Sequence, residues 1–243
     1  MTNTEQKTIE NSVADVIARV AAAARAAGKQ PEDIHLVAAS KMNDAERVRA
    51  AIAAGIRICG ENRVQELLEK YEQNAYEGAD LHFIGTLQSN KVKYLIGKVS
   101  LIHSVSSLKL MQTIDREAAK QGVRQDVLLE VNIGGEDAKS GFRPDELPAA
   151  LALASKLGSL RVLGLMAIPP IPLEAHGNLC YFRDMQQLFV DISSKKYDNV
   201  NMVYLSMGMS HDFEDAIACG ANMVRVGTGI FGARYYPPAD PAK

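Results

Sequence analysis

Continuous apolar runs recur along this chain, and stretches with helical character separate each run from the next. Residues 127–129 (VLL) and 162–166 (VLGLM) have no polar side chain at alternate positions. Strands of this type are buried on both faces, as they are in parallel sheets covered by helices. The pattern therefore predicts an α/β fold with a parallel sheet.

The spacing of the runs predicts eight strands. They cover residues 35–40, 57–60, 81–85, 101–105, 126–133, 161–168, 202–207 and 223–226. Helical stretches lie between them at residues 44–54, 63–74, 90–97, 108–121, 144–157, 179–194 and 211–219. Another helix precedes the first strand, because apolar residues from Ile9 to Val20 recur at steps of three and four.

Eight βα units in 243 residues fit a (β/α)₈ TIM barrel, which we predict as a single domain over residues 1–243. The ordered barrel would span residues 8–234, and residues 235–243 would form a short C-terminal tail. The extra N-terminal helix would fill the place in the outer ring that the short segment after the last strand leaves empty. A doubly wound open sheet is the alternative, but it needs two edge strands, and no predicted strand is polar enough for one.

Charge, cysteine content and hydropathy argue against several classes of protein. The 27 basic and 29 acidic residues give a net charge of −2, whereas nucleic-acid binding needs a strongly basic face. The three cysteines are scattered, which predicts a reducing, cytoplasmic location rather than a disulfide framework. No apolar run reaches the roughly 18 residues of a membrane span, so no membrane partner is expected. The outer helices show no surplus apolar face, which predicts a monomer.

The strand ends are the place to look for a site, because chemistry in such barrels gathers there. The last two strands end in residues 206–210 (SMGMS) and 225–228 (RVGT), which are rich in small and hydroxyl residues. Backbone N–H groups can close around an anion at such a place, and a helix beginning near His211 would help. The alternative is that these glycines only make tight turns.

Lys41 stands at the end of the first predicted strand, next to the last strand of a closed barrel. A lysine amine forms a Schiff base only when uncharged, and burial at the barrel mouth would lower its pKa from about 10.4. Beside an anion site, the amine would hold a phosphorylated aldehyde covalently. The alternative is an ordinary solvated lysine before a helix.

Arg225 and Asn62 are further candidates for the barrel mouth. Opposite a ring nitrogen, the guanidinium of Arg225 would keep that nitrogen unprotonated and limit carbanion chemistry; alternatively it pairs with Glu130 or Glu61. Asn62 either bonds a ring hydroxyl or caps the next helix. The histidines at positions 82, 103 and 211 do not have the spacing of a metal site, so no metal is predicted and a structural role is expected for each.

Several segments together resemble the pyridoxal phosphate homeostasis protein family, the single-domain relatives of the alanine racemase N-terminal barrel. They are residues 37–41 (VAASK), 60–66 (GENRVQE), 82–91 (HFIGTLQSNK), 205–210 (LSMGMS) and 224–232 (VRVGTGIFG). The resemblance runs from about residue 10 to Arg234. His211 departs from the acidic residue expected after Ser210, and Gly229 stands where one family form has another small residue.

The resemblance implies a bound cofactor, pyridoxal 5′-phosphate (PLP), held as a Schiff base on Lys41. It implies Arg225 opposite the pyridine nitrogen and Asn62 near the ring. It also implies phosphate contacts from a group at the ends of the last two strands, namely Ser206, Ser210, Gly227 and Thr228. The partners that it implies are PLP and PLP-dependent apoenzymes.

The function implied is PLP and amino-acid homeostasis without established turnover, so no catalytic residue is assigned. A low-activity amino-acid racemase is one alternative, but racemisation needs a proton donor on each face of the substrate. Lys41 supplies one face, and nothing in the sequence places Tyr235 or Tyr236 near the other. A Schiff-base sugar-phosphate barrel enzyme is a second alternative.

Overall fold

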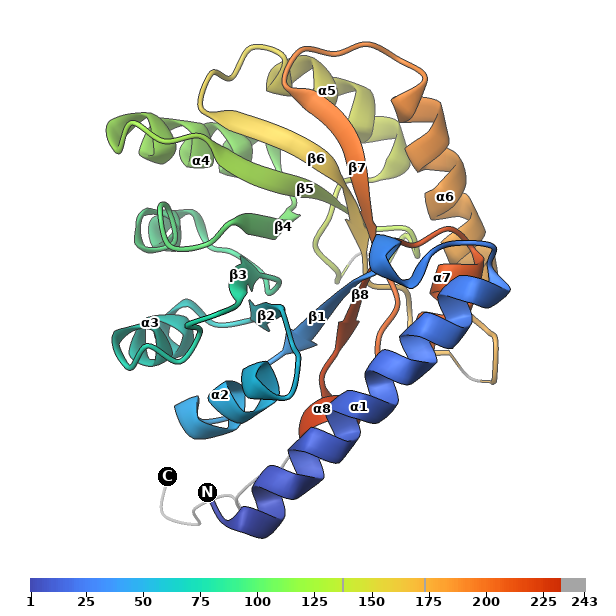
Figure 1. Ribbon diagram of the computed structural model, residues 1–243. Helices are drawn as coiled ribbons and strands as arrows, with labels where there is room; N and C mark the ends of the chain where they lie inside the picture. The colour runs from blue at the N-terminus through green and yellow to red at the C-terminus, as the bar shows by residue number, and fades with distance from the viewer. Residues whose placement is uncertain (137, 173, 233–243) are drawn as a thin grey trace, which may run out of the picture.

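The computed structural model describes residues 1–136, 138–172 and 174–232. Its eight strands pair in parallel in sequence order, and the last pairs with the first, so the sheet closes into a barrel (Figure 1). The predicted (β/α)₈ barrel is thereby confirmed. The strands are β1 (His35–Ala39), β2 (Ile58–Glu61), β3 (Asp80–Phe83), β4 (Leu101–Val105), β5 (Gln125–Val131), β6 (Leu160–Ala167), β7 (Val200–Ser206) and β8 (Met223–Val226).

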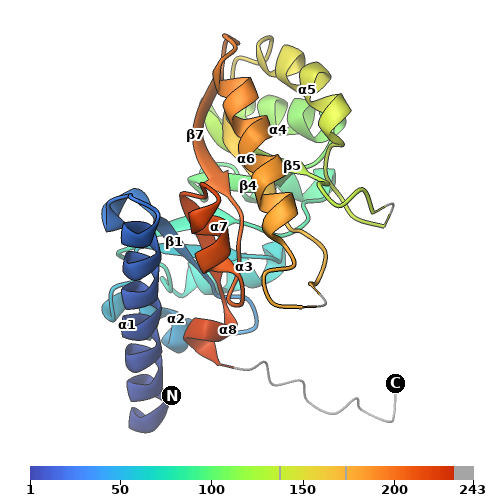
Figure 2. The ribbon, with the colours of Figure 1, turned by 90° about the vertical axis from the view of Figure 1, so that its right-hand side faces the viewer.

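Helices surround the barrel on its outside (Figures 1 and 2). The α-helices are α1 (Asn3–Ala26), α2 (Ala45–Ala53), α3 (Val64–Glu72), α4 (Leu108–Lys120), α5 (Leu147–Ala154), α6 (Leu179–Ser193), α7 (Phe213–Ala218) and α8 (Thr228–Phe231). The described residues also form three short 3₁₀ helices, η1 (Pro31–Asp33), η2 (Ser89–Tyr94) and η3 (Pro144–Glu146). Within the described residues, no helix is both long enough and apolar enough to cross a membrane.

Two predicted helical stretches take a different form in the structure. The stretch at residues 90–97 forms the 3₁₀ helix η2, and Gly97, with a φ of 76°, has left the helical conformation by the end of the predicted stretch. The stretch at residues 144–157 divides into η3 and α5. Pro148 lies at the start of α5 and has no N–H to bond the preceding turn.

The leading helix takes the predicted place in the outer ring. Its buried face consists of Ile9, Val13, Val16, Val20 and Ala24. This face packs on α8, α7 and α2, and Figure 2 shows α1 alongside α7. The helix α1 therefore fills the place in the outer ring that the short helix α8, after β8, does not fill.

Alternate strand residues face opposite sides of the barrel wall. The inward side has a small apolar core, made of Val37, Ile58, Ile84, Leu101, Leu128, Met166 and Met223. The outward side packs a larger core against the helices. Residues 233 and 234 of the predicted barrel, and the predicted tail at 235–243 with Tyr235 and Tyr236, lie outside the described residues.

Candidate functional site

Barrel closure brings the ends of the first and last strands together. The pairing of β1 with β8 reaches Ala38 and Val226. A Cβ atom added to Gly227 would lie 3.4 Å from the carbonyl oxygen of Ala39 and 3.5 Å from its Cβ. Lys41 follows two residues later in the turn after β1 and is half-buried. The segments predicted to carry the amine and the anion site are therefore neighbours.

Ser210 and the start of α8 form a cluster of hydrogen-bond donors. The Ser210 hydroxyl oxygen accepts from the backbone N–H of Gly227, at 3.2 Å, and from that of Gly229, at 3.3 Å. Because both bonds use the oxygen, the hydroxyl hydrogen is left to donate. Thr228 is the first residue of α8 and lies between the two glycines. Three of the predicted anion contacts, Ser210, Gly227 and Thr228, thus lie in one place.

The helix predicted to begin at His211 starts two residues later in the structure. It is α7, which begins at Phe213 with Asp212 as its N-cap residue. The Asp212 carboxylate accepts hydrogen bonds from the backbone N–H of Met209, at 2.7 Å, and from the Asn178 amide, at 2.8 Å. A carboxylate at a helix N-terminus disfavours a second anion there, so this helix lends no support to the predicted anion site.

Arg225 lies inside the barrel and is 4 % exposed. Its Nη1 donates to the Ser206 hydroxyl oxygen at 2.6 Å, and its Nη2 donates to the Ala167 carbonyl at 2.9 Å. Burial lowers the pKa of Arg225 to about 10, so it stays charged at neutral pH. Ser206 is therefore bonded to Arg225 rather than to the cluster around Ser210.

Two buried histidines extend this arrangement across the barrel interior. His103 Nδ1 lies 3.1 Å from the Ser206 hydroxyl, and His103 Nε2 lies 3.0 Å from His82 Nδ1. Burial lowers the pKa of His82 to about 3 and that of His103 well below its usual value, so both rings are neutral. We call His82, His103, Ser206 and Arg225 the interior chain. Sequence reasoning expected only separate structural roles for these histidines and missed their connection to Arg225.

The salt bridges considered for Arg225 are not formed among the described residues. Glu61 lies on the outward side of the barrel wall, so that alternative is wrong. Glu130 faces inward, and one of its oxygens accepts from Ser140 at 3.1 Å. Its other oxygen is buried without a hydrogen-bond partner in the described part of the chain, and burial raises the pKa of this carboxyl. Glu130 therefore affects Arg225 only through longer-range electrostatics.

Asn62 follows β2 and retains an open acceptor. Its side-chain oxygen is buried and has no partner among the residues that the structure describes. Gly85 packs so closely that a Cβ atom there would lie 2.2 Å from the Asn62 carbonyl oxygen. Arg63, not Asn62, is the N-cap residue of α3, so the capping alternative is wrong. A buried acceptor without a partner can accept a hydrogen bond from a hydroxyl group of a bound ligand.

A second buried polar group lies behind the barrel wall and was not predicted. We call it the wall cluster, and it consists of Ser40, Glu61, Glu66, Lys70 and Tyr76. Glu61 Oε1 accepts from the Ser40 hydroxyl at 2.6 Å, from Lys70 Nζ at 2.7 Å and from the Tyr76 hydroxyl at 3.0 Å. Burial raises the pKa of the Glu61 carboxyl, although Lys70 acts in the opposite direction.

The wall cluster holds the backbone on both sides of Lys41. Lys70 Nζ donates to the Ser40 carbonyl at 2.8 Å and to Glu66 at 2.7 Å. Glu66 also accepts from the backbone N–H of Met42 at 2.5 Å. Met42 has a φ of 61°, which is unfavourable for a residue with a side chain. The cluster therefore fixes the strained turn in which Lys41 lies.

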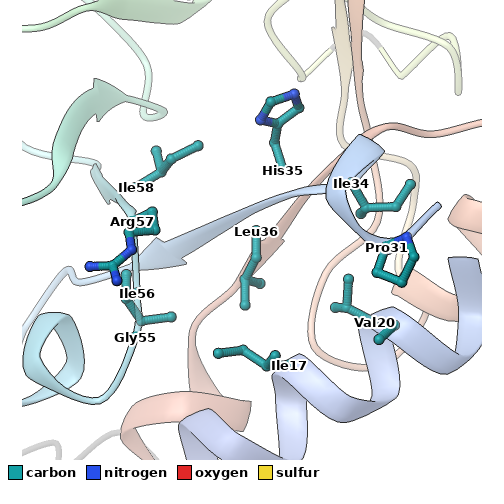
Figure 3. A pocket seen from close by; sticks show the side chains of 11 residues that line it. Ile17, Val20, Pro31, Ile34, His35, Leu36, Gly55, Ile56, Arg57 and Ile58 are labelled. Carbon is teal, nitrogen blue, oxygen red and sulfur yellow. The ribbon is translucent and has the colours of Figure 1, made fainter.

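An apolar pocket at the opposite end of the barrel is separate from these groups. It has a volume of about 320 Å³ and lies between α1 and the beginnings of β1 and β2 (Figure 3). Its lining includes Ile17, Val20, Ile34, Leu36 and Ile56. It contains none of the predicted site residues.

Comparisons with known proteins show the family to which the chain belongs. The family model for the alanine racemase N-terminal domain matches residues 13–235. A pyridoxal phosphate homeostasis protein from Aquifex aeolicus is 44% identical over 221 residues, which are 91% of this chain and 96% of the relative. One from Pseudomonas aeruginosa is 41% identical over 229 residues, covering 94% of this chain and 97% of the relative.

Solved structures show the same barrel. An unknown protein from Bifidobacterium adolescentis has a TM-score of 0.87 at 35% identity, and the match covers 95% of this chain and 97% of that chain. PipY of Synechococcus elongatus, solved with PLP bound, has a TM-score of 0.79 at 32% identity, covering 92% of this chain and 100% of its own. On its sequence and its closed barrel, this chain belongs to the pyridoxal phosphate homeostasis protein family.

Proposed function

We propose that this protein binds PLP, attached covalently to Lys41, and acts in PLP and amino-acid homeostasis without established turnover. The observation that carries the proposal is barrel closure, which brings the turn containing Lys41 next to the donors of Ser210, Gly227 and Thr228. The names of the relatives and the PLP-bound structure of PipY support it.

The residues present fit the parts of PLP. Bound PLP supplies an aldehyde and an electron-withdrawing ring. The amine of Lys41 would hold the aldehyde carbon, and the unpartnered Asn62 oxygen would accept the ring hydroxyl. Arg225 would face the pyridine nitrogen and keep it unprotonated, because a guanidinium stays charged at neutral pH. A ring in that state is a weak electron sink, which suits a carrier better than a catalyst of carbanion chemistry.

The hydrogen-bond donors at the start of α8 would bind the phosphate group of PLP. Ser210, Gly227 and Thr228 would contact it directly. Ser206 was also predicted as a phosphate contact, but its hydroxyl is 2.6 Å from Arg225 and 3.1 Å from His103. We therefore propose that Ser206 serves the ring end of the site through Arg225.

We propose further that the protein works as a cytoplasmic monomer that supplies PLP to PLP-dependent apoenzymes. The near-neutral net charge of −2 gives no support for a nucleic-acid partner. Light scattering during gel filtration measures the oligomeric state. Transfer is tested by mixing the PLP-loaded protein with an apoenzyme and following the appearance of its activity in the presence of a trap for free PLP.

Absorbance of the purified protein tests the binding site. Added PLP should produce a visible band that Lys41→Ala removes and that Lys93→Ala, at an exposed lysine, leaves in place. A colourless protein that takes up no PLP would contradict the proposal. Incubation with L-alanine tests the racemase alternative, because sustained loss of optical rotation would replace the carrier function by catalysis.

Thr228→Val tests the phosphate contact. A hydrogen bond from a hydroxyl to a charged group contributes about 1.5–3 kcal/mol, so the Kd for PLP should rise roughly 10- to 100-fold. Thr113→Val is the matched control, since that hydroxyl bonds the Lys109 carbonyl within α4. Equal PLP affinities for Thr228→Val and the parent would exclude the contact.

A further inference from the structure

The interior chain begins at a group that can only donate hydrogen bonds. Arg225 has five N–H groups and no acceptor, so the Ser206 oxygen must accept in the 2.6 Å contact between them. The direction of every other hydrogen bond in the chain then depends on where the Ser206 hydroxyl hydrogen points. Ser206 is fully buried, so that hydrogen needs a protein acceptor.

The chain can run in two directions. In the first, Ser206 donates to His103 Nδ1, and His103 Nε2–H donates to His82 Nδ1. In the second, His82 Nδ1–H donates to His103 Nε2, and His103 Nδ1–H donates to Ser206. The second direction leaves the Ser206 hydrogen without an acceptor among the described residues. An unpaired buried donor is disfavoured by roughly 5- to 150-fold, so the first direction prevails.

The far end of the chain is consistent with the first direction. His82 is 5 % exposed. Its second ring nitrogen, Nε2, is not one of the fully buried side-chain atoms that lack a hydrogen-bond partner in the described residues. Its Nε2–H is thus placed to bond water. A doubly protonated His103 would instead put a second positive charge beside the buried Arg225 guanidinium, which the low local polarity makes unfavourable.

The two anchors of the Arg225 guanidinium differ in rigidity. One is the Ala167 carbonyl, which the backbone of β6 holds in place. The other is the Ser206 hydroxyl, which can rotate about its C–O bond unless something holds its hydrogen. His103 Nδ1 is the acceptor that holds it, and His82 in turn fixes which His103 nitrogen is the acceptor.

We propose that His103, oriented by His82, is a positioning residue that keeps the Ser206 lone pairs toward Arg225, with both imidazoles as neutral Nε2–H tautomers. The positioning role rests on the proposed function, because it matters to PLP only if Arg225 faces the pyridine nitrogen. The hydrogen-bond direction itself is a property of the protein without PLP.

Ring ¹⁵N–¹H correlation spectra of the full-length, PLP-free protein test the direction. His103→Asn and His82→Asn identify the two sets of signals. Both rings should show a bare Nδ1 and a protonated Nε2, unchanged between pH 6 and pH 8. A protonated Nδ1 on His103, or an imidazolium in this range, would overturn the proposal. This result does not depend on whether the protein binds PLP.

Three serine variants test the positioning role in the PLP-loaded protein. Ser206→Ala should mix the His103 tautomers, shift the absorption band of bound PLP and speed PLP loss on the order of tenfold. Ser206→Thr, which keeps a hydroxyl, should restore all three. Ser104→Ala is the matched control, because this buried serine on β4 has no hydrogen-bond partner within the described residues. Identical spectra and PLP loss rates for the two alanine variants would refute the role.

Discussion

Two buried polar groups lie on opposite sides of the barrel wall, and they differ in how their charges are paired. The interior chain joins one buried cation, Arg225, to neutral partners through single hydrogen bonds. The wall cluster instead pairs Lys70 with the carboxylates of Glu61 and Glu66. Neutral partners leave the charge of Arg225 available to a ligand in the barrel, whereas the ion pairs of the wall cluster balance one another's charge and fix the backbone.

The two groups hold different parts of the proposed site. The wall cluster bonds Ser40 and Met42 on either side of Lys41. The interior chain holds Arg225, on the neighbouring strand β8. Substitutions in the wall cluster should therefore mainly lower the free energy of unfolding. Substitutions in the interior chain should mainly change how that free energy depends on pH, and the surroundings of bound PLP.

The largest effect is expected for Lys70→Ala. It leaves the Glu61 carboxylate, which is fully buried, without its cationic partner. Breaking a buried pair in this way costs about 3–5 kcal/mol of the free energy of unfolding, which urea denaturation measures. Lys120→Ala, which breaks an exposed pair with Glu117, is the control and should cost far less. Equal losses would mean that the wall cluster does not stabilise the fold.

A smaller effect on the free energy of unfolding is expected for His82→Gln, and it should appear at acid pH. The pKa of His82 is lowered to about 3 from an ordinary value of 6.5, so the unfolded chain takes up this proton first as the pH falls. The stability that the neutral ring contributes is full above pH 6.5 and declines as the pH falls toward 3. Between pH 6.5 and 4.5 the parent should lose about 2–3 kcal/mol more than His82→Gln.

Unfolding free energies at pH 7 and pH 4.5 measure this difference. Subtracting the two values for each protein removes any effect of the substitution that does not depend on pH. Parallel losses in the parent and in His82→Gln would show that His82 is not the source of acid sensitivity.

The smallest effect on the free energy of unfolding is expected for Glu66→Gln. This substitution weakens the hydrogen bond from the Met42 amide but leaves no cavity. The cost should be about 1 kcal/mol, and hydrogen exchange at the Met42 N–H should quicken by roughly 3- to 10-fold. Glu69→Gln, at an exposed position of the same helix, should leave that exchange rate unchanged. If Met42 exchanged equally in both variants, Glu66 would not hold the turn.

Much of the fold could be predicted because buried parallel strands are continuous apolar runs. The predicted bounds of β4 and β8 coincide with Leu101–Val105 and Met223–Val226. Lys41, Gly227 and Thr228 could be placed at one end of the barrel because strand order fixes which ends meet. The helix predicted from His211 begins two residues later, at Phe213, and the Asp212 carboxylate before it bonds Met209 and Asn178 instead of the helix.

The side of the wall on which each residue lies was harder to predict. Glu61 was considered for the barrel mouth, yet it follows Ile58 by three residues and so faces the other side. Strand alternation could have revealed this. The contact between His103 and Ser206 could not be predicted in this way, because it joins residues 103 positions apart across a barrel whose strand register shifts within β4 and β5.

The sequence by itself determined the eight strands, most of the helices around them and the family, because burial on both faces and local motifs are properties of consecutive residues. The tertiary structure alone decided that Ser206 links two buried histidines to Arg225, and that a buried ion cluster holds the turn of Lys41. Hydrogen bonds act over about 3 Å and depend on direction. Their partners are therefore set by how the closed sheet aligns distant strands.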